Sequence, residues 1–136
     1  MGTTRTILLV EDDPDLREAM EQALERSGFA VHAVGDAVDA EAALQCGLPC
    51  LVITDMMLPG ASGFSIIRSV VERSEGQIPV LMISGNTCRE HRDYALAAGA
   101  NGFLAKPFDL DELVSLARTF CPPPRPTAVE LAAMPV

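Results

Sequence analysis

The sequence contains no Trp, a single Tyr and few basic residues. Its longest apolar runs are well short of the roughly 18 residues that a membrane-spanning helix needs. The N-terminal segment MGTTRTILLVEDD reaches acidic residues too early for a secretory signal. Lys and Arg number 10 against 19 Asp and Glu, which gives a net charge of −9. Binding to phosphate backbones depends on Lys and Arg, so this composition favours proteins or cations as partners and argues against direct contact with nucleic acid or membrane.

Cysteine is also sparse, with four residues at positions 46, 50, 88 and 121. Only Cys46 and Cys50 are close in sequence, and no His lies near them at the spacing of a zinc site. We therefore expect reduced thiols, some of them in the core, in a cytoplasmic protein.

The order of apolar and helical patterns predicts an α/β fold. Buried strands are expected at 5–10, 29–34, 50–54, 79–84 and 102–105, alternating with helices at 14–26, 37–46, 63–74, 89–98 and 110–120. Asp13, Asp36 and Asp109 stand where helix N-caps are expected. Strands rich in Val, Ile and Leu that alternate with helices indicate a doubly wound parallel sheet covered on both faces. We expect one domain over residues 1–120, followed by a Pro-rich tail at 121–136 with five prolines.

Polar residues gather where the predicted strands end. In parallel folds of this type, ligands bind outside the carboxyl ends of the strands. Each residue alone has an ordinary structural explanation, such as a helix cap, a turn or a solvated side chain. The set comprises Glu11, Asp12 and Asp13 after the first strand, Asp55 at the third, Ser84 at the fourth and Lys106 after the fifth.

Together these residues indicate phosphoryl chemistry. Glu11, Asp12 and Asp55 would repel one another unless a cation joined them. Hard carboxylate oxygens suit Mg²⁺, which often bridges to phosphate oxygens. Lys106 and Ser84 are suited to bind the oxygens of a phosphoryl group. A carboxylate in such a site can act as the nucleophile, so Asp55 is predicted to accept a phosphoryl group as an acyl phosphate.

At this point the sequence resembles the receiver domains of bacterial two-component response regulators, in particular the stand-alone, chemotaxis-regulator-like kind. The resemblance covers residues 5 to about 120 and rests on VEDD (10–13), TDMMLPGASG (54–63), MISG (82–85) and KPF (106–108). It implies a flavodoxin-like (βα)5 sheet with strand order 2-1-3-4-5.

The resemblance also implies roles for individual residues. Asp55 would take a phosphoryl group from a sensor histidine kinase or phosphotransfer protein. Mg²⁺ would be bound by Asp12, Asp55 and the Met57 carbonyl, and by Glu11 through water. Ser84 and Lys106 would contact the phosphoryl group, and Phe103 would be the switch aromatic. The Lys106-Pro107 peptide would be cis, an isomer found at only roughly 5–6% of X–Pro bonds.

Departures from the family pattern are small. Glu11 replaces the commoner Asp, whereas Ser62 fits the small or acidic residue often found before the glycine of the third-strand loop. Met57 and Asn86 lie two residues after the acceptor and after the switch hydroxyl. Because a Met side chain cannot orient a water molecule, we expect slow loss of the phosphoryl group.

The family mechanism implies that phosphorylation draws Ser84 inward and lets Phe103 fill the vacated space. This would change the surface formed by the fourth helix, fifth strand and fifth helix. No DNA-binding segment follows in this sequence, so output is expected through a downstream protein target, with a homodimer through the same surface left open. A stand-alone regulator, a phosphate relay and a receiver from a hybrid kinase all fit; the initial Met and the tail favour the first.

Two other functions remain open at this stage. An aspartyl-phosphate hydrolase of the haloacid dehalogenase type would need an Asp-x-Asp pair on the first strand, and Asp13-Pro14-Asp15 has that spacing at the start of a helix instead. A receiver-like interaction module that is never phosphorylated would be expected to lack part of the acidic site. A flavin domain is disfavoured by the absence of Ser, Thr and Gly in the first loop. We expect no enzyme activity beyond the chain's own phosphorylation and dephosphorylation.

Overall fold

The structure, a computed structural model, describes residues 6–58, 60–85, 89–122 and 132, and for 89–91 the backbone alone. Arg5, Asn86, Cys88 and most of the predicted tail at 121–136 lie outside the described residues. Five parallel strands form the central sheet in the order β2-β1-β3-β6-β7. They are β1 (Thr6–Val10), β2 (Ala30–Val34), β3 (Leu51–Asp55), β6 (Val80–Ser84) and β7 (Gly102–Ala105). Counted along the chain, these five strands have the order 2-1-3-4-5, which confirms the predicted flavodoxin-like fold.

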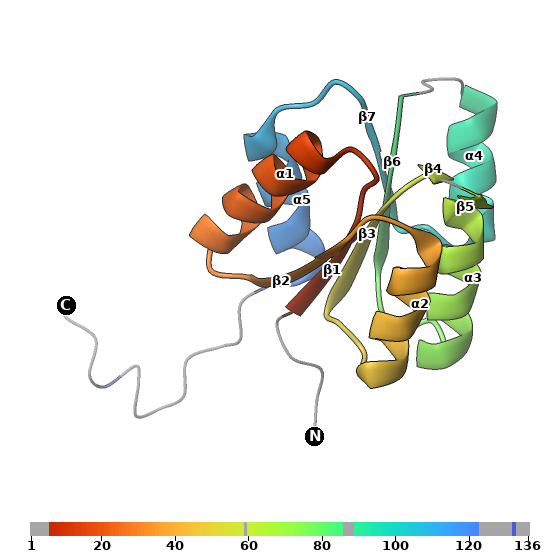
Figure 1. Cartoon of the computed structure of the whole chain (residues 1–136), viewed down its shortest axis with the longest axis horizontal. Coiled ribbons are helices and arrows are strands. Elements are labelled where there is room, and N and C mark those ends of the chain that lie inside the picture. Colours follow the sequence, from red (N-terminus) through yellow and green to blue (C-terminus); the bar gives the residue numbers. More distant parts are fainter. Residues whose placement is uncertain (1–5, 59, 86–88, 123–131, 133–136) are drawn as a thin grey trace.

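In the described part of the chain, five helices cover the two faces of the sheet. They are α1 (Pro14–Arg26), α2 (Ala37–Cys46), α3 (Gly63–Ser74), α4 (Arg89–Ala98) and α5 (Leu110–Phe120). Helices α1 and α5 lie on one face, and α2, α3 and α4 lie on the other (Figure 1). Among the described residues, no helix combines the length and the apolar character that crossing a membrane requires.

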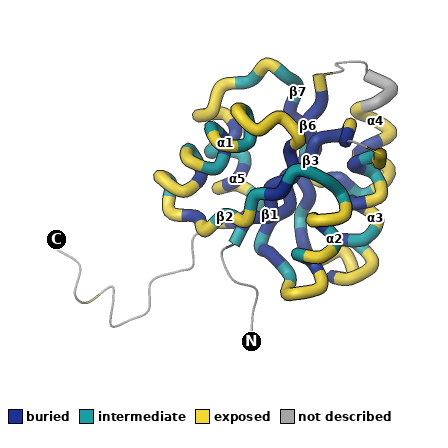
Figure 2. The backbone as a smooth tube through the Cα atoms, in the orientation of Figure 1, coloured by how far each residue is buried: buried dark blue, intermediate teal, exposed yellow. Residues whose placement is uncertain are grey.

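The alternation of side chains along the strands divides the core into two layers. On β3, Leu51 and Ile53 pack with Leu24 of α1 and Leu113 of α5. Val52, one residue out of phase, packs on the opposite side with the α3 residues, including Ile67. Figure 2 shows burial concentrated in the central strands, with the outer sides of the helices exposed. Burial on both faces explains why these strands read as continuous apolar runs.

Two of the three expected caps form as predicted. The Asp13 carboxylate accepts hydrogen bonds from the backbone N–H groups of Asp15 and Leu16, and that of Asp36 accepts one from Asp39. Asp109 is the N-cap residue of α5, but its side chain makes no capping hydrogen bond, so that expectation was wrong in detail. The first turn of α5 instead carries Asp111 and Glu112, which favour the positive end of the helix dipole.

A short hairpin between β3 and α3 was not predicted. Its strands β4 (Met57–Leu58) and β5 (Ala61–Ser62) pair antiparallel, with Met57 opposite Ser62. Two-residue strands have no detectable alternation, so sequence patterns cannot reveal them. The hairpin pairs the backbone of Met57 and Leu58, just after Asp55, with that of Ala61 and Ser62.

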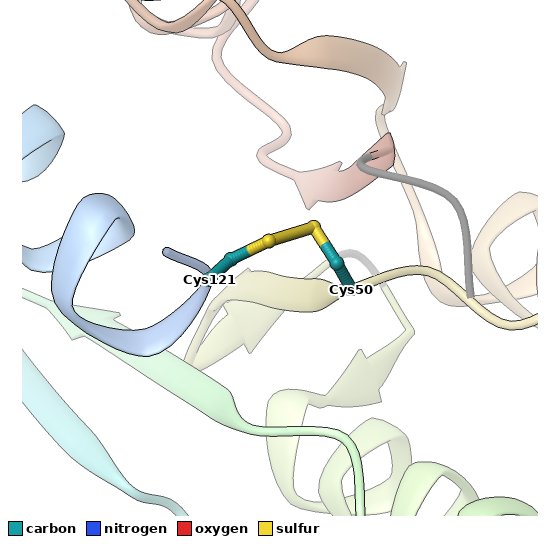
Figure 3. The surroundings of a disulfide bond; sticks show 2 residues. All are labelled: Cys50 and Cys121. Carbon is teal, nitrogen blue, oxygen red and sulfur yellow. A yellow bond between two sulfur atoms is a disulfide. The ribbon is translucent and has the colours of Figure 1, made fainter. Parts of the chain in front are cut away.

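The expectation that all cysteines are reduced thiols is contradicted at one pair. Cys50 and Cys121 form a disulfide that joins the segment before β3 to the end of α5 (Figure 3). They lie 71 positions apart in the sequence, so a search for close cysteines could not connect them. Cys46 is exposed and is the free cysteine within the described part of the chain.

Candidate functional site

The fold brings the predicted site residues to one edge of the sheet. Glu11 directly follows β1, Asp55 ends β3 and Lys106 directly follows β7. Asp55 pairs in register with Ile83 of β6, and Ser84 pairs with Ala105 of β7. Because the strands are parallel, their carboxyl ends meet at this edge, as the sequence predicted.

Lys106 links the two buried acids. Its Nζ donates a hydrogen bond to Oδ2 of Asp55 at 2.7 Å and lies 2.8 Å from Oε1 of Glu11. Glu11 is 1% exposed and Asp55 is 6% exposed, whereas the Lys106 side chain is 26% exposed. One ammonium group therefore compensates two carboxylates that have lost most of their contact with water.

Burial and charge shift the pKa values of Glu11 and Lys106. Burial raises the pKa of Glu11, and the interaction with Lys106 and the Asp13 N–H, which bonds Oε2 at 3.1 Å, only partly offsets that effect. For Lys106, burial lowers the pKa, but the bonds with Asp55 and Glu11 outweigh burial and raise it. The pKa values of both groups therefore lie above their ordinary values, that of Lys106 because of its two acidic partners and that of Glu11 because of burial.

The acidic cluster fits a divalent cation. Carboxylate oxygens of Glu11, Asp12 and Asp55 lie within 4.8 Å of one another. Asp12 is exposed and gives the cluster an open side. Oε1 of Glu11 is buried and accepts no well-directed hydrogen bond, although it lies close to Lys106. Hard oxygen donors with room for water are the ligands that Mg²⁺ prefers.

The backbone of Met57 is held by hydrogen bonds, whereas the residue is largely exposed to solvent. Its N–H donates to Oδ1 of Asp55 at 3.1 Å, so the two Asp55 oxygens have different partners. Met57 is 73% exposed, two residues after the predicted acceptor. The hairpin pairing with Ser62 holds this backbone in place.

Ser84 and Phe103 lie near each other on neighbouring strands. Phe103 pairs in register with Met82, two residues before Ser84, and both Phe103 and Met82 pack in the same core layer. The side chains of Ser84 and Phe103 therefore leave the sheet on the same face. The Ser84 carbonyl accepts the Lys106 N–H at 2.8 Å. The Lys106-Pro107 peptide that follows is cis.

Two contributors to the site were missed by sequence reasoning. Gly63 begins α3 against the backbone of Asp55, and its N–H donates to the Met56 carbonyl at 2.8 Å. Arg17 of α1 donates from its guanidinium to the Glu11 carbonyl at 2.8 Å. Gly63 falls at the end of the TDMMLPGASG motif, a usable signal, whereas nothing in the sequence connects Arg17 with Glu11.

Fold and acidic edge together define a flavodoxin-like α/β domain with a carboxylate cluster at the carboxyl ends of its strands. The chain belongs to the response regulator receiver domain family, whose model matches residues 7–118. It is 39% identical over 118 residues to the transcriptional regulatory protein CseB of Streptomyces avermitilis, covering 87% of this chain and 49% of that protein. The chemotaxis response regulator CheY4 of Vibrio cholerae has a similar structure, with a TM-score of 0.79 and 28% identity over 87% of this chain and 99% of that one.

Other relatives are longer than this chain. The C4-dicarboxylate transport transcriptional regulatory protein DctD of Rhizobium meliloti is 35% identical over 87% of this chain, but the match covers 25% of DctD. The chain thus spans between a quarter and about half of these two regulators, DctD and CseB. What the chain shares with them is the receiver domain of a two-component system.

Proposed function

We propose that Asp55 accepts a phosphoryl group from a sensor histidine kinase or a phosphotransfer protein. An Asp55 carboxylate oxygen attacks the phosphorus of a phosphohistidine, and an acyl phosphate bond forms as the phosphorus–nitrogen bond breaks. The released imidazole takes up a proton from solvent. The chain catalyses only this transfer and the hydrolysis of its own acyl phosphate, and it has no other substrate.

The observation that carries this proposal is the position of Lys106. Its ammonium lies 2.7 Å from Asp55 Oδ2 and 2.8 Å from Glu11 Oε1. A cation placed there neutralises charge that builds up on phosphoryl oxygens near Asp55. The hydroxyl of Ser84, on the neighbouring strand, is assigned to bind another of these oxygens.

Receiver domains bind Mg²⁺ through acidic residues, and we assign the ligands here to Asp12, Asp55 and the Met57 carbonyl, with Glu11 acting through water. When bound, the ion neutralises charge between the carboxylates and the phosphoryl oxygens. The residues of the chain do the positioning. Arg17 and the Asp13 N–H hold Glu11, and the Met57 N–H orients Asp55.

The signal is assigned to the surface formed by α4, β7 and α5. Contact between Ser84 and the phosphoryl group would draw the hydroxyl toward Asp55, and Phe103 would move into the space left behind. Both side chains leave the same face of the sheet, which supports this coupling. The changed surface would bind a downstream protein in the cytoplasm or a second copy of the chain, without direct contact with nucleic acid or membrane.

The alternatives are less well supported. A hydrolase of the haloacid dehalogenase type needs its nucleophile on a strand, but Asp13 caps α1 and Asp15 lies in its first turn. An interaction module that is never phosphorylated has no need of a lysine held between two buried acids. Turnover of a small phosphate ester would favour the first alternative, and failure to phosphorylate would favour the second.

The test is phosphorylation of the protein by acetyl phosphate with Mg²⁺, followed by intact mass. We expect the wild type to gain one phosphoryl group that hydroxylamine removes. Asp55→Asn should gain none, and Asp13→Asn, which keeps a capping oxygen, should behave as the wild type. Modification of Asp55→Asn to the same extent would refute Asp55 as the acceptor. Beryllofluoride binding by wild type but not Asp55→Asn gives an independent readout.

A further inference from the structure

The disulfide lies at the opposite end of β3 from the phosphoacceptor site. Cys50 directly precedes β3, whose last residue is Asp55, and Cys121 directly follows α5. Their Cα atoms are 5.9 Å apart, within the usual range for a disulfide. The bond therefore connects the central strand to the last helix across a large separation in sequence (Figure 3).

We propose that Cys50 and Cys121 form a reversible redox switch that controls how firmly the end of α5 is held against the sheet. In the disulfide state the last turn of α5 is tied to the start of β3. In the dithiol state that turn is held only by packing and its own backbone hydrogen bonds. The inference rests on geometry, and the switch works without phosphorylation of Asp55.

Apart from the disulfide, packing holds the end of α5: Ala117 and Cys121 lie in the core, and Leu116 and Phe120 pack against it. Leu113 and Ala117 are buried against the sheet, but the residues after Ala117 up to Phe120 are exposed or half-buried. The Cys121 N–H donates to the Ala117 carbonyl at 2.8 Å, a bond within the same turn. The Phe120 ring lies close to Gly102, where an added Cβ would be 2.9 Å from it. Loss of the disulfide would leave this turn held by the packing of Leu116, Ala117, Phe120 and Cys121 alone.

The two cysteines differ in accessibility in a way that permits exchange. Cys121 is 6% exposed, whereas Cys50 is half-buried. Because Cys50 is the more exposed residue of the two, we expect a thiol reductant such as glutathione to attack its sulfur, forming a mixed disulfide there and releasing Cys121 as a thiolate that takes up a proton. A second glutathione thiolate then attacks the mixed disulfide. Two glutathione thiols are oxidised to one glutathione disulfide, and two cysteine thiols are formed.

A reversible bond fits the location proposed for the chain. Disulfides in reducing compartments are usually transient or redox-sensing. Helix α5 also forms part of the surface proposed to signal, so oxidation would restrain one border of that surface. This consequence rests on the proposed function, whereas the switch itself does not.

The first test is a redox titration. The Cys46→Ser/Cys88→Ser variant leaves Cys50 and Cys121 as its only thiols. After equilibration in buffers of varied glutathione to glutathione disulfide ratio, thiols are alkylated and the intact mass is measured. As the buffer becomes more reducing, we expect a single transition from protein that carries no alkyl groups to protein that carries two. A pair that stays fully reduced in glutathione disulfide, or fully oxidised at the most reducing ratio, would overturn the proposal.

The second test measures amide hydrogen exchange at the end of α5 in the same variant. Residues 117–121 should exchange about tenfold or more faster in the dithiol state than in the disulfide state. The exchange rates of residues 7–10 in β1 should differ far less between the two redox states. A control with Cys50→Ser and Cys121→Ser added should exchange rapidly under both conditions. Equal exchange in the two redox states would overturn the proposed control of α5. Because Asp55→Asn should give the same result, failure here is distinguishable from failure of phosphorylation.

Discussion

Gly63 packs so closely on the backbone of Asp55 that a Cβ atom at position 63 would overlap the Asp55 carbonyl oxygen. The same Cβ would lie 3.1 Å from Cα of Met56. Both obstacles are backbone atoms, so no side chain can rotate to make room. The start of α3 thus lies directly against the residue proposed to accept phosphate.

Replacing Gly63 with Ala should therefore move Asp55 and destabilise the fold. Alanine is the better helix former, so helix propensity alone would predict a gain. Backbone overlap should instead cost about 1–3 kcal/mol and slow phosphorylation by acetyl phosphate. Urea unfolding and phosphorylation rates measure the two effects. Gly85→Ala is the control, because nothing lies within 4 Å of its added Cβ. If Gly63→Ala matched that control in stability, the close packing would not hold.

Lys106 should stabilise the metal-free protein by compensating Glu11 and Asp55. Lys106→Met would leave these buried acids without their cation, which should cost about 2 kcal/mol of unfolding free energy in the presence of a chelator. Added Mg²⁺ should recover part of this loss, because it binds the same carboxylates. Thermal melts with and without Mg²⁺ test this, with Arg68→Met, whose salt bridge to Glu72 is exposed, as control. A loss no larger than that of Arg68→Met would contradict the role of Lys106.

The sequence was sufficient to predict the sheet and the location of the site for a physical reason. Strands such as β3 and β6 are buried on both faces, so they appear as uninterrupted apolar runs. Acids and a lysine that follow such runs must meet at one edge once the strands are parallel. The strand order was also predicted correctly, although it came from the family resemblance and not from periodicity; the residue roles that the resemblance implies stay predictions.

What the sequence did not reveal depends on contacts between distant segments. The disulfide joins Cys50 and Cys121 only because α5 ends beside the start of β3. Arg17 reaches Glu11 through the packing angle of α1, and the β4–β5 hairpin is too short to leave a pattern. At Asp109 the sequence predicted a contact that does not form, since a residue type favoured at helix starts need not make the capping hydrogen bond.

The raised pKa of Glu11 predicts how stability changes with pH in the absence of metal. An unfolded Glu has a pKa near 4.3, and burial raises the value in the folded protein. The stabilisation that Glu11 contributes to the folded state is therefore fully present below about pH 4, and it is lost as the pH rises through the pKa that Glu11 has in the folded protein. Compared with Glu11→Gln, the wild type should lose stability as the pH rises from about 4 to 7 in chelator.

Denaturant unfolding of the wild type and Glu11→Gln across this pH range measures the difference. The raised pKa of Lys106 does not interfere, because that group titrates far above the range. Glu72→Gln provides a control at an exposed carboxylate. A difference between wild type and Glu11→Gln that stayed constant with pH would mean that the pKa of Glu11 is not raised.

Met57 is expected to limit how fast the acyl phosphate is lost. Met57 is 73% exposed, and its side chain offers no group that can orient a water molecule. Its backbone N–H is already committed to Asp55 Oδ1, so a substitution changes the side chain while the backbone bond remains. Met57→Asn adds a hydrogen-bonding amide at this position and should speed hydrolysis by about tenfold or more. The measurement is decay of the phosphorylated protein by intact mass after removal of acetyl phosphate, with Val38→Asn, at another exposed apolar residue, as control. Decay within minutes in the wild type that Met57→Asn leaves unaltered would show that water access is set elsewhere.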